Sequence, residues 1–229
     1  MSVDRRLFWD QKILGWETDK YSDLKGALSK IFDVNQSIKK RLDFAKQILA
    51  QAAKGKTVLE LGCGSCRLLE DVFNADAKKY IGFDISSVAI NEAKSNANKL
   101  GLTSTTEFHA SDLSQLDLGS VDLTFSLGLL DWLNLTELAE ALKNLTSEYY
   151  FHSYSEKRPF SLQQLAHRYY VHVLYGHKTK SYVPKYYLRQ QMIELFQTAY
   201  GERPKFFRPN ISFGDIVYKL PAGTILPKM

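Results

Sequence analysis

The sequence predicts an α/β protein in which helices cover both faces of a mostly parallel sheet. From residue 37 onwards, short apolar segments of strand length alternate with longer segments of helical periodicity. This alternation is typical of parallel strands joined by helices. Val58, Leu59 and Leu61 form an apolar run suited to a strand buried on both faces. Two strand-like segments close the chain with a short connection, which predicts an antiparallel hairpin at the sheet edge.

Residues 1–36 are rich in aromatic side chains and precede the alternating pattern. Trp9 and Trp16 fall in a stretch that is expected to be short and irregular. Such a segment either packs over a pocket as a lid or is an N-terminal extension pinned by its tryptophans. An amphipathic helix is expected over residues 37–53. We therefore expect residues 1–50 to form an N-terminal helical arm or lid.

The remaining elements are expected in a regular order. Strands are expected near residues 57–62, 79–84, 105–109, 121–126, 148–153, 205–209 and 211–220. Helices are expected after the first strand and over residues 86–99, 135–145, 161–175 and 186–200. The pattern pauses at about 153–185, where a basic, aromatic segment is inserted.

Length and composition predict one globular domain with an appendage. With 229 residues, of which 45% are hydrophobic and 24% charged, the chain can bury a full-sized core. The first ten residues carry charges in place of an apolar signal-peptide core. No stretch reaches the roughly 18 consecutive apolar residues of a membrane span. A cytoplasmic protein is expected.

The charges are unevenly distributed along the chain. The net charge is +5, but residues 56–150 carry 7 Lys or Arg against 14 Asp or Glu, whereas residues 151–229 carry 12 against 4. A basic C-terminal third predicts contact with an anion. Basic residues that merely solvate surface helices are the alternative.

The two cysteines, Cys63 and Cys66, form a CxxC pair. A structural zinc site needs about four ligands, and the sequence offers no second CxxC or paired His/Cys cluster. A redox pair is not expected inside a glycine turn that follows a buried strand. We therefore expect two small side chains that pack under a ligand, and no metal site.

Three acidic residues fall at or just beyond the ends of consecutive strands. Glu60 lies near the end of the first strand, Asp84 ends the second, and Asp112 follows the third. Because ligands bind outside the carboxyl ends of parallel strands, these carboxylates should line one site. The spacing of about 20 residues between the glycine turn and Asp84 suits acceptance from both hydroxyls of a ribose. Asp112 is placed to accept from an adenine amino group, with the Leu113 N–H near the ring.

The glycine turn itself narrows the kind of ligand. A dinucleotide fingerprint would read GxGxxG, but Arg67 holds the third glycine position and the turn reads ExGxG. Here the sequence resembles the class I S-adenosylmethionine-dependent methyltransferases. LELGCG resembles the first motif of that family, Asp84 in GFDIS its ribose acid, and Asp112 in ASDL its adenine acid. The resemblance covers roughly residues 37–152, and it departs from the family at Cys66, where many members have glycine.

This resemblance implies a Rossmann-like three-layer sandwich with a seven-stranded sheet whose last strand is antiparallel. It also implies S-adenosyl-L-methionine as cofactor, whose sulfonium methyl group is displaced by a substrate nucleophile, a reaction that rests on proximity and alignment. The methyltransferase domain would span residues 51–229. The expected cofactor-binding residues are Glu60, Gly62, Cys63, Gly64, Asp84, Ile85, Asp112, Leu113 and Ser126.

The segment after the fourth strand bears on the methyl acceptor. Enzymes that methylate nucleobase amino groups resemble one another in a [DNS]PP[YFW] motif there, whereas residues 126–133 read SLGLLDWL. This looks more like the small-molecule branch, in which the loop walls the methyl-transfer pocket. We expect a small, anionic acceptor of sugar, porphyrin or natural-product type. The side chains expected to bind it are Trp9, Trp16, Arg168, His172 and Tyr175.

Two residues are candidates for a general base. His152 is expected at the carboxyl end of the fifth strand, facing the substrate, and Asp131 lies just past the fourth strand. A structural histidine is the alternative for the first. Two other functions remain open at this point: an RNA methyltransferase, suggested by a pI near 9.0, and an S-adenosylmethionine-binding protein without catalysis.

Overall fold

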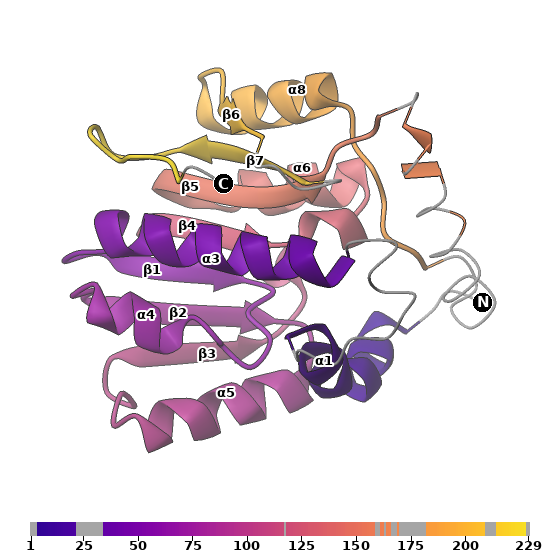
Figure 1. Cartoon of the computed structure of the whole chain (residues 1–229). Coiled ribbons are helices and arrows are strands. Elements are labelled where there is room, and N and C mark those ends of the chain that lie inside the picture. Colours follow the sequence, from indigo (N-terminus) through magenta and orange to yellow (C-terminus); the bar gives the residue numbers. More distant parts are fainter. Residues whose placement is uncertain are drawn as a thin grey trace.

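The computed structural model describes most of the chain and shows the predicted sheet (Figure 1). The described residues are 4–21, 34–116, 118–158, 161, 162, 164, 165, 169, 182–208 and 214–227. Within them, seven strands form one sheet in the order β3-β2-β1-β4-β5-β7-β6. The strands are β1 (Thr57–Leu61), β2 (Lys79–Asp84), β3 (Thr106–Ala110), β4 (Ser120–Leu127), β5 (Thr146–Ser155), β6 (Lys205–Phe207) and β7 (Gly214–Lys219).

Strand directions follow the predicted pattern. The neighbouring pairs among β1 to β5 are parallel, and β7 is antiparallel to both of its neighbours. The helices are α1 (Arg5–Tyr21), α3 (Val34–Ala52), α4 (Leu69–Asn74), α5 (Ser87–Lys99), α6 (Leu135–Lys143) and α8 (Arg189–Tyr200), with short 3-10 helices η1 (Leu113–Gln115) and η2 (Leu130–Trp132). The expected Rossmann-like sandwich with an antiparallel last strand is confirmed.

Helices form a layer on each side of the sheet. Figure 1 shows α3, α4 and α5 over one face, and α6 and α8 over the other. On the first face, Phe44 of α3 packs against Phe151, which stacks on Phe125 at 5.0 Å between ring centroids. On the second face, Phe196 of α8 packs against Tyr150 of β5 at 5.1 Å. All five rings are fully buried, so they lie at the centre of the fold.

The expected boundary of the N-terminal arm at residue 50 falls inside α3. Four side chains of α3 are fully buried in the main hydrophobic core: Phe44, Ala45, Ile48 and Leu49. α3 is therefore part of the helical layer, and α1 is the element that can act as an arm.

The stretch around Trp9 was expected to be irregular, and this expectation is wrong. It lies in α1, whose first turn is held by Asp4: the Leu7 N–H donates to the Asp4 carboxylate at 3.1 Å and the Phe8 N–H to the Asp4 carbonyl at 3.0 Å. This is ordinary N-terminal capping by an aspartate. Figure 1 places α1 beyond the carboxyl ends of β1 to β3, beside the start of α5. α1 thus lies where a ligand of this fold is expected.

Two further comparisons with the predicted elements concern the second half of the chain. β5 continues two residues beyond its expected end, because its last residue, Ser155, pairs with Gly214 of β7. The helix expected over residues 161–175 falls largely outside the described residues, as does most of the insertion. None of the described helices is long and apolar enough to cross a bilayer.

The placement of α3 generates a stability prediction. Phe44→Ala should lower the free energy of unfolding by about 3–5 kcal/mol, because it removes a fully buried ring and leaves a cavity between helix and sheet. Urea denaturation followed by circular dichroism measures this, with Leu7→Ala on the exposed face of α1 as control. A loss below about 1 kcal/mol for Phe44→Ala would show that α3 is not part of the core.

Candidate active site

The glycine turn after β1 has a backbone that requires glycine at two positions. Gly62 and Gly64 have φ angles of 67° and 54°, in the left-handed region that side chains disfavour. The Gly62 and Cys63 N–H groups donate to the Phe83 carbonyl of β2 at 2.7 and 3.2 Å. The turn is therefore anchored to the neighbouring strand as well as to β1.

Asp84 connects this turn to the following helix. Its Oδ2 accepts from the Gly64 N–H at 2.9 Å, and its Oδ1 accepts from the Ser86 N–H at 2.8 Å. Ser86 in turn caps α5 by accepting from the Ala89 N–H at 3.1 Å. Burial raises the pKa of Asp84 to about 6, although the two backbone hydrogen bonds act in the opposite direction. Each oxygen retains a lone pair for a further donor, such as a ribose hydroxyl.

Glu60 and the two cysteines lie beneath the turn. The Tyr80 hydroxyl donates to Glu60 at 2.6 Å, and burial raises the pKa of Glu60 to about 8, so this carboxyl is mostly protonated at neutral pH. Cys63 and Cys66 are buried free thiols whose pKa values are raised by burial. Buried thiols with raised pKa values are unreactive, in agreement with the packing role expected for them. The described residues contain no group of three metal-ligating side chains.

Cys66 has a φ of 59°, which accounts for the glycine that many members of the family have at this position. The backbone at this position is left-handed, and glycine adopts that conformation without strain. Cysteine is tolerated here in a buried site, where its side chain contributes to the core.

Asp112, Leu113 and Ile85 lie at the same edge of the sheet. Asp84 is paired in register with Ala110, so the end of β3 lies beside the end of β2. Asp112 caps η1 by accepting from the Ser114 N–H at 2.9 Å, and its side chain is half-buried. Leu113 and Ile85 are half-buried as well. Two carboxylates thus lie at or just beyond the ends of adjacent strands, Asp84 in contact with the glycine turn and Asp112 beyond β3, and binding of an adenine by Asp112 stays a prediction.

An aromatic cluster joins α1 to the loop after β4. Trp9 packs edge-on against Trp132 at 4.8 Å between ring centroids, and its Nε1–H donates to the Tyr182 hydroxyl at 3.1 Å. Phe8 packs on Tyr182 at 5.3 Å. The loop expected to wall the methyl-transfer pocket is therefore in contact with one of the two tryptophans expected to bind the acceptor.

A family model described as a methyltransferase domain matches residues 52–187. The chain belongs to this family. Its strand order and the cradle formed by Gly62, Gly64 and Asp84 agree with the match. It is a class I S-adenosylmethionine-dependent methyltransferase.

Solved structures of methyltransferases share the fold. The magnesium protoporphyrin IX methyltransferase of Synechocystis PCC 6803, solved with bound SAH, is 18% identical, with a TM-score of 0.69 over 95% of this chain and 98% of that one. An S-adenosylmethionine-dependent methyltransferase from Mesorhizobium loti is 16% identical, with a TM-score of 0.56 over 76% and 94%. A geranyl diphosphate methyltransferase is 11% identical, with a TM-score of 0.58 over 81% and 78%. No curated protein sequence matches significantly.

The residues present fit the cofactor. An added Cβ at Gly62 would lie 3.1 Å from the Leu129 side chain, so the turn can approach its neighbours only without a side chain. Free lone pairs on Asp84 suit a ribose, and the loop after β3 offers Asp112 and the Leu113 N–H to an adenine. When bound, the cofactor supplies a methyl group on a positively charged sulfur. The acids around the turn suit that charge.

His152 does not lie where the sequence placed it. β5 extends to Ser155, so His152 is inside the sheet, fully buried, and packs against Phe196 of α8. Burial lowers its pKa to about 3. Its Nδ1 is hydrogen-bonded to Ser126 Oγ at 2.9 Å, so Ser126, expected at the cofactor, is directed into the core. The expectation that His152 faces the substrate is wrong, because the longer strand moves it into the hydrophobic layer.

Asp131 is buried and fully engaged. The Ser155 N–H and hydroxyl donate to its two oxygens at 2.6 and 2.8 Å, and Arg41 lies 3.7 Å away. Burial raises its pKa from the usual value, while Arg41 opposes that change. These contacts hold the loop after β4 against the end of β5. They suit a role for Asp131 in positioning this loop, which is expected to line the acceptor pocket.

Four of the acceptor residues expected from sequence cannot be placed by their side chains. Arg168, His172 and Tyr175 lie outside the described residues. Trp16 lies in α1, but the structure does not describe its own side chain.

Two acids of α1, Asp10 and Glu17, were not predicted from the sequence, and they contact the start of α5 and the glycine turn. Asp10 accepts from Ser86 Oγ at 2.7 Å, and Glu17 accepts from the Ser65 N–H at 3.0 Å. Their spacing of seven residues, with Ile13 between them, places all three on one helical face. That pattern is visible in the sequence once the segment is recognised as a helix.

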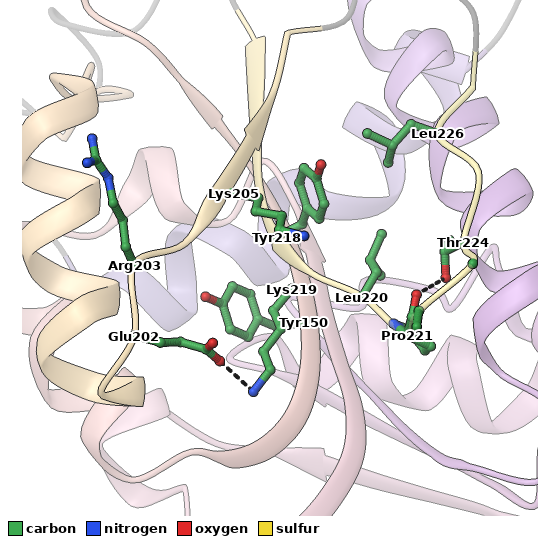
Figure 2. Close-up of a pocket in the computed structure, with 12 residues that line it drawn as sticks. Tyr150, Glu202, Arg203, Lys205, Tyr218, Lys219, Leu220, Pro221, Thr224 and Leu226 are labelled. Carbon is green, nitrogen blue, oxygen red and sulfur yellow. Dashed lines mark hydrogen bonds and ion pairs between the residues drawn. The ribbon is translucent and has the colours of Figure 1, made fainter.

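A groove of about 370 Å³ lies away from this site (Figure 2). It is lined by the end of β7, the start of β6 and the chain from Pro221 to Leu226, at the amino-terminal edge of the parallel strands. The Glu202–Lys219 ion pair of 2.5 Å crosses it. Because the cofactor cradle lies at the opposite edge, this groove is not the methyl-transfer site.

The raised pKa of Asp84 generates a pH prediction. The ionised carboxylate is the form expected to accept from both ribose hydroxyls, so affinity for S-adenosylmethionine should fall as the pH drops from about 7 to below 6. Calorimetry from about pH 5 to pH 7 measures this, a range in which Glu60 stays protonated. Asp84→Asn should bind weakly and without this dependence. Wild-type affinity in Asp84→Asn would remove the ribose assignment.

The burial of His152 generates a second prediction. His152→Asn should leave the pH–rate profile unchanged, because an imidazole with a pKa of about 3 contributes no titration near neutrality. It should lower the free energy of unfolding by about 1–3 kcal/mol through the disturbed contact with Ser126. Steady-state kinetics and urea denaturation measure the two effects. Loss of a titrating limb near neutral pH would restore His152 as the base.

Proposed function

We propose that this enzyme transfers the methyl group to an oxygen or nitrogen atom of a small, anionic molecule. The observation that supports an anionic acceptor is a cluster of three arginines at the carboxyl end of β5. Arg158, Arg189 and Arg208 surround two acids, Glu156 and Asp215. We call this group the arginine cluster.

Each arginine of the cluster contacts both acids. Arg158 lies 3.3 Å from Glu156 and 3.5 Å from Asp215. Arg189 lies 3.6 Å from Glu156 and also pairs with Asp215. Arg208 lies 3.3 Å from Asp215 and also pairs with Glu156. Three positive and two negative charges leave the cluster with an excess of one positive charge.

The exposure of the cluster suits binding of an anion. Glu156 and Asp215 are 7% and 0% exposed, so the negative charges are held inside. The side chains of Arg189 and Arg208 are 40% and 52% exposed, so the guanidinium groups form the outer surface. A guanidinium has five N–H donors and binds carboxylates or phosphates through two of them at once.

The position of the cluster supports a role in acceptor binding. Ser155, the last residue of β5, does not belong to the cluster. Its N–H donates to Asp131 in the loop after β4, next to Trp132. Glu156 follows directly and belongs to the cluster. The aromatic cluster and the arginine cluster are therefore connected through the consecutive residues Ser155 and Glu156 at one edge of the sheet. This arrangement suits a molecule with an apolar body and an anionic group.

Structural comparison is compatible with this class of acceptor. The Synechocystis enzyme named above is a magnesium protoporphyrin IX methyltransferase, and it shares nearly its entire length with this chain. Because the identity is low, the comparison supports a shared fold and does not identify the substrate. The described side chains contribute to catalysis by holding the cofactor at Asp84 and aligning the acceptor against Trp9 and Trp132, since proximity and orientation supply much of the rate of methyl transfer.

The proposal is tested by incubation with methyl-labelled cofactor and a fractionated metabolite extract. The acceptor is expected in an anionic fraction. With the acceptor identified, Arg208→Ala should raise its KM by about tenfold or more, because a hydrogen bond to a charged group contributes roughly 1.5–3 kcal/mol. Cofactor affinity should remain unchanged.

Arg203→Ala is the matched control for Arg208→Ala. Arg203 precedes β6 and lines the groove of Figure 2, whereas Arg208 follows β6 at the other edge. The control should leave KM unchanged. Equal KM values for Arg208→Ala and wild type would remove the cluster from acceptor binding. Methyl transfer to RNA with strongly salt-dependent binding would instead favour a nucleic-acid substrate.

A further inference from the structure

α1 is attached beside the cofactor cradle by two carboxylates, one that accepts from the start of α5 and one that accepts from the glycine turn. Asp10 binds at the start of α5, where the Ser86 hydroxyl donates at 2.7 Å and the Val88 N–H at 3.2 Å. Glu17 lies about two turns further along the same face of α1, where the Ser65 N–H donates at 3.0 Å. In the chain, Ser86 lies two residues after Asp84, and Ser65 comes directly after Gly64.

The Glu17 carboxylate lies on the surface of the glycine turn. A Cβ added at Gly64 would be 2.0 Å from Glu17 Oε1 and 3.9 Å from the Ile13 side chain. Glu17 is only 6% exposed, and Arg67 lies 3.9 Å from its second oxygen. The side of Gly64 that lacks a side chain is therefore the side that Glu17 covers.

This is the surface that the cofactor needs. A turn with two left-handed glycines allows a ligand to approach the backbone closely, and the Ser65 N–H is a donor suited to an anionic group. S-adenosylmethionine carries one such group, its α-carboxylate. Two carboxylates cannot occupy one N–H and one patch of backbone together.

We propose that Glu17 is an internal competitor for the cofactor site: its carboxylate holds the Ser65 N–H until the cofactor carboxylate replaces it and α1 moves away from the turn. Electrostatics act in the same direction. The Glu17 carboxylate adds a second negative charge beside that of Asp84, and like charges at close range disfavour one another. Displacement of Glu17 relieves that repulsion. The contacts of Asp10 with α5 lie beyond the turn and can guide the return of α1.

Glu17→Ala should bind S-adenosylmethionine and S-adenosylhomocysteine about three- to tenfold more tightly than wild type, because no internal group has to be displaced. Glu17→Gln, which keeps an acceptor oxygen but not the charge, should lie between the two. Calorimetry measures the affinities, and stopped-flow mixing should show that the gain lies in faster association. Both variants are first checked for an unchanged circular dichroism spectrum.

Asp4→Asn is the matched control. Asp4 is an exposed acid of the same helical segment that caps the Leu7 N–H, and asparagine caps equally well, so only a charge remote from the turn is lost. Its cofactor affinity should equal that of wild type.

Hydrogen exchange supplies a readout that is independent of affinity. Amides of residues 8–21 should lose protection when the cofactor binds to the wild-type protein, because α1 leaves the turn. Tighter protection of α1 together with weaker binding by Glu17→Ala would overturn the proposal and make Glu17 a ligand of the cofactor ammonium. Unchanged affinity would also overturn it. These measurements use the cofactor alone, so they are independent of the proposed acceptor.

Discussion

The two hydrogen bonds of the Asp84 carboxylate hold the cofactor half of the site together. One fixes the Gly64 N–H after β1, and the other fixes the Ser86 N–H at the start of α5. A buried carboxylate is costly, and this one has a pKa near 6 because two backbone donors only partly replace water. Each Asp84 oxygen has a further lone pair at the edge of the sheet. A ligand with two adjacent hydroxyls would supply donors for these lone pairs.

α1 links the two halves of the site through two of its faces. The face with Asp10 and Glu17 contacts the cofactor cradle, and the face with Phe8 and Trp9 packs against the loop after β4. A displacement of this helix from the cradle therefore also moves the wall of the acceptor pocket. Among the described side chains of α1, only Ile13 and Glu17 are deeply buried, at 7% and 6% exposure, so its attachment depends largely on polar contacts that a ligand can replace.

The sequence predicted the strands and the glycine turn of the cofactor half well because their signals are local. A buried strand, two glycines and an acid at the end of the next strand lie within 30 residues, and parallel strands bring them together. The errors depend on distant contacts. His152 is buried because β5 pairs with β7, some 60 residues later in the chain, and that pairing lengthens the strand. The partners of Glu17 and Asp10 lie 48 and 76 residues away, so no local pattern could reveal them.

The uneven charge of the sequence corresponds to two regions at the carboxyl edge of the sheet, one acidic and one basic. The acidic segment 56–150 supplies the cradle, while the arginine cluster comes from the basic segment 151–229. A sulfonium cation is suited to the first and the proposed anionic acceptor to the second. If the methylated atom belongs to the anionic group itself, transfer from the sulfonium neutralises both charges, and a low-dielectric surrounding favours such a step more than water does. The packed rings of Trp9 and Trp132 join α1, which contacts the cradle, to the loop after β4, which leads to the arginine cluster through Asp131 and Ser155.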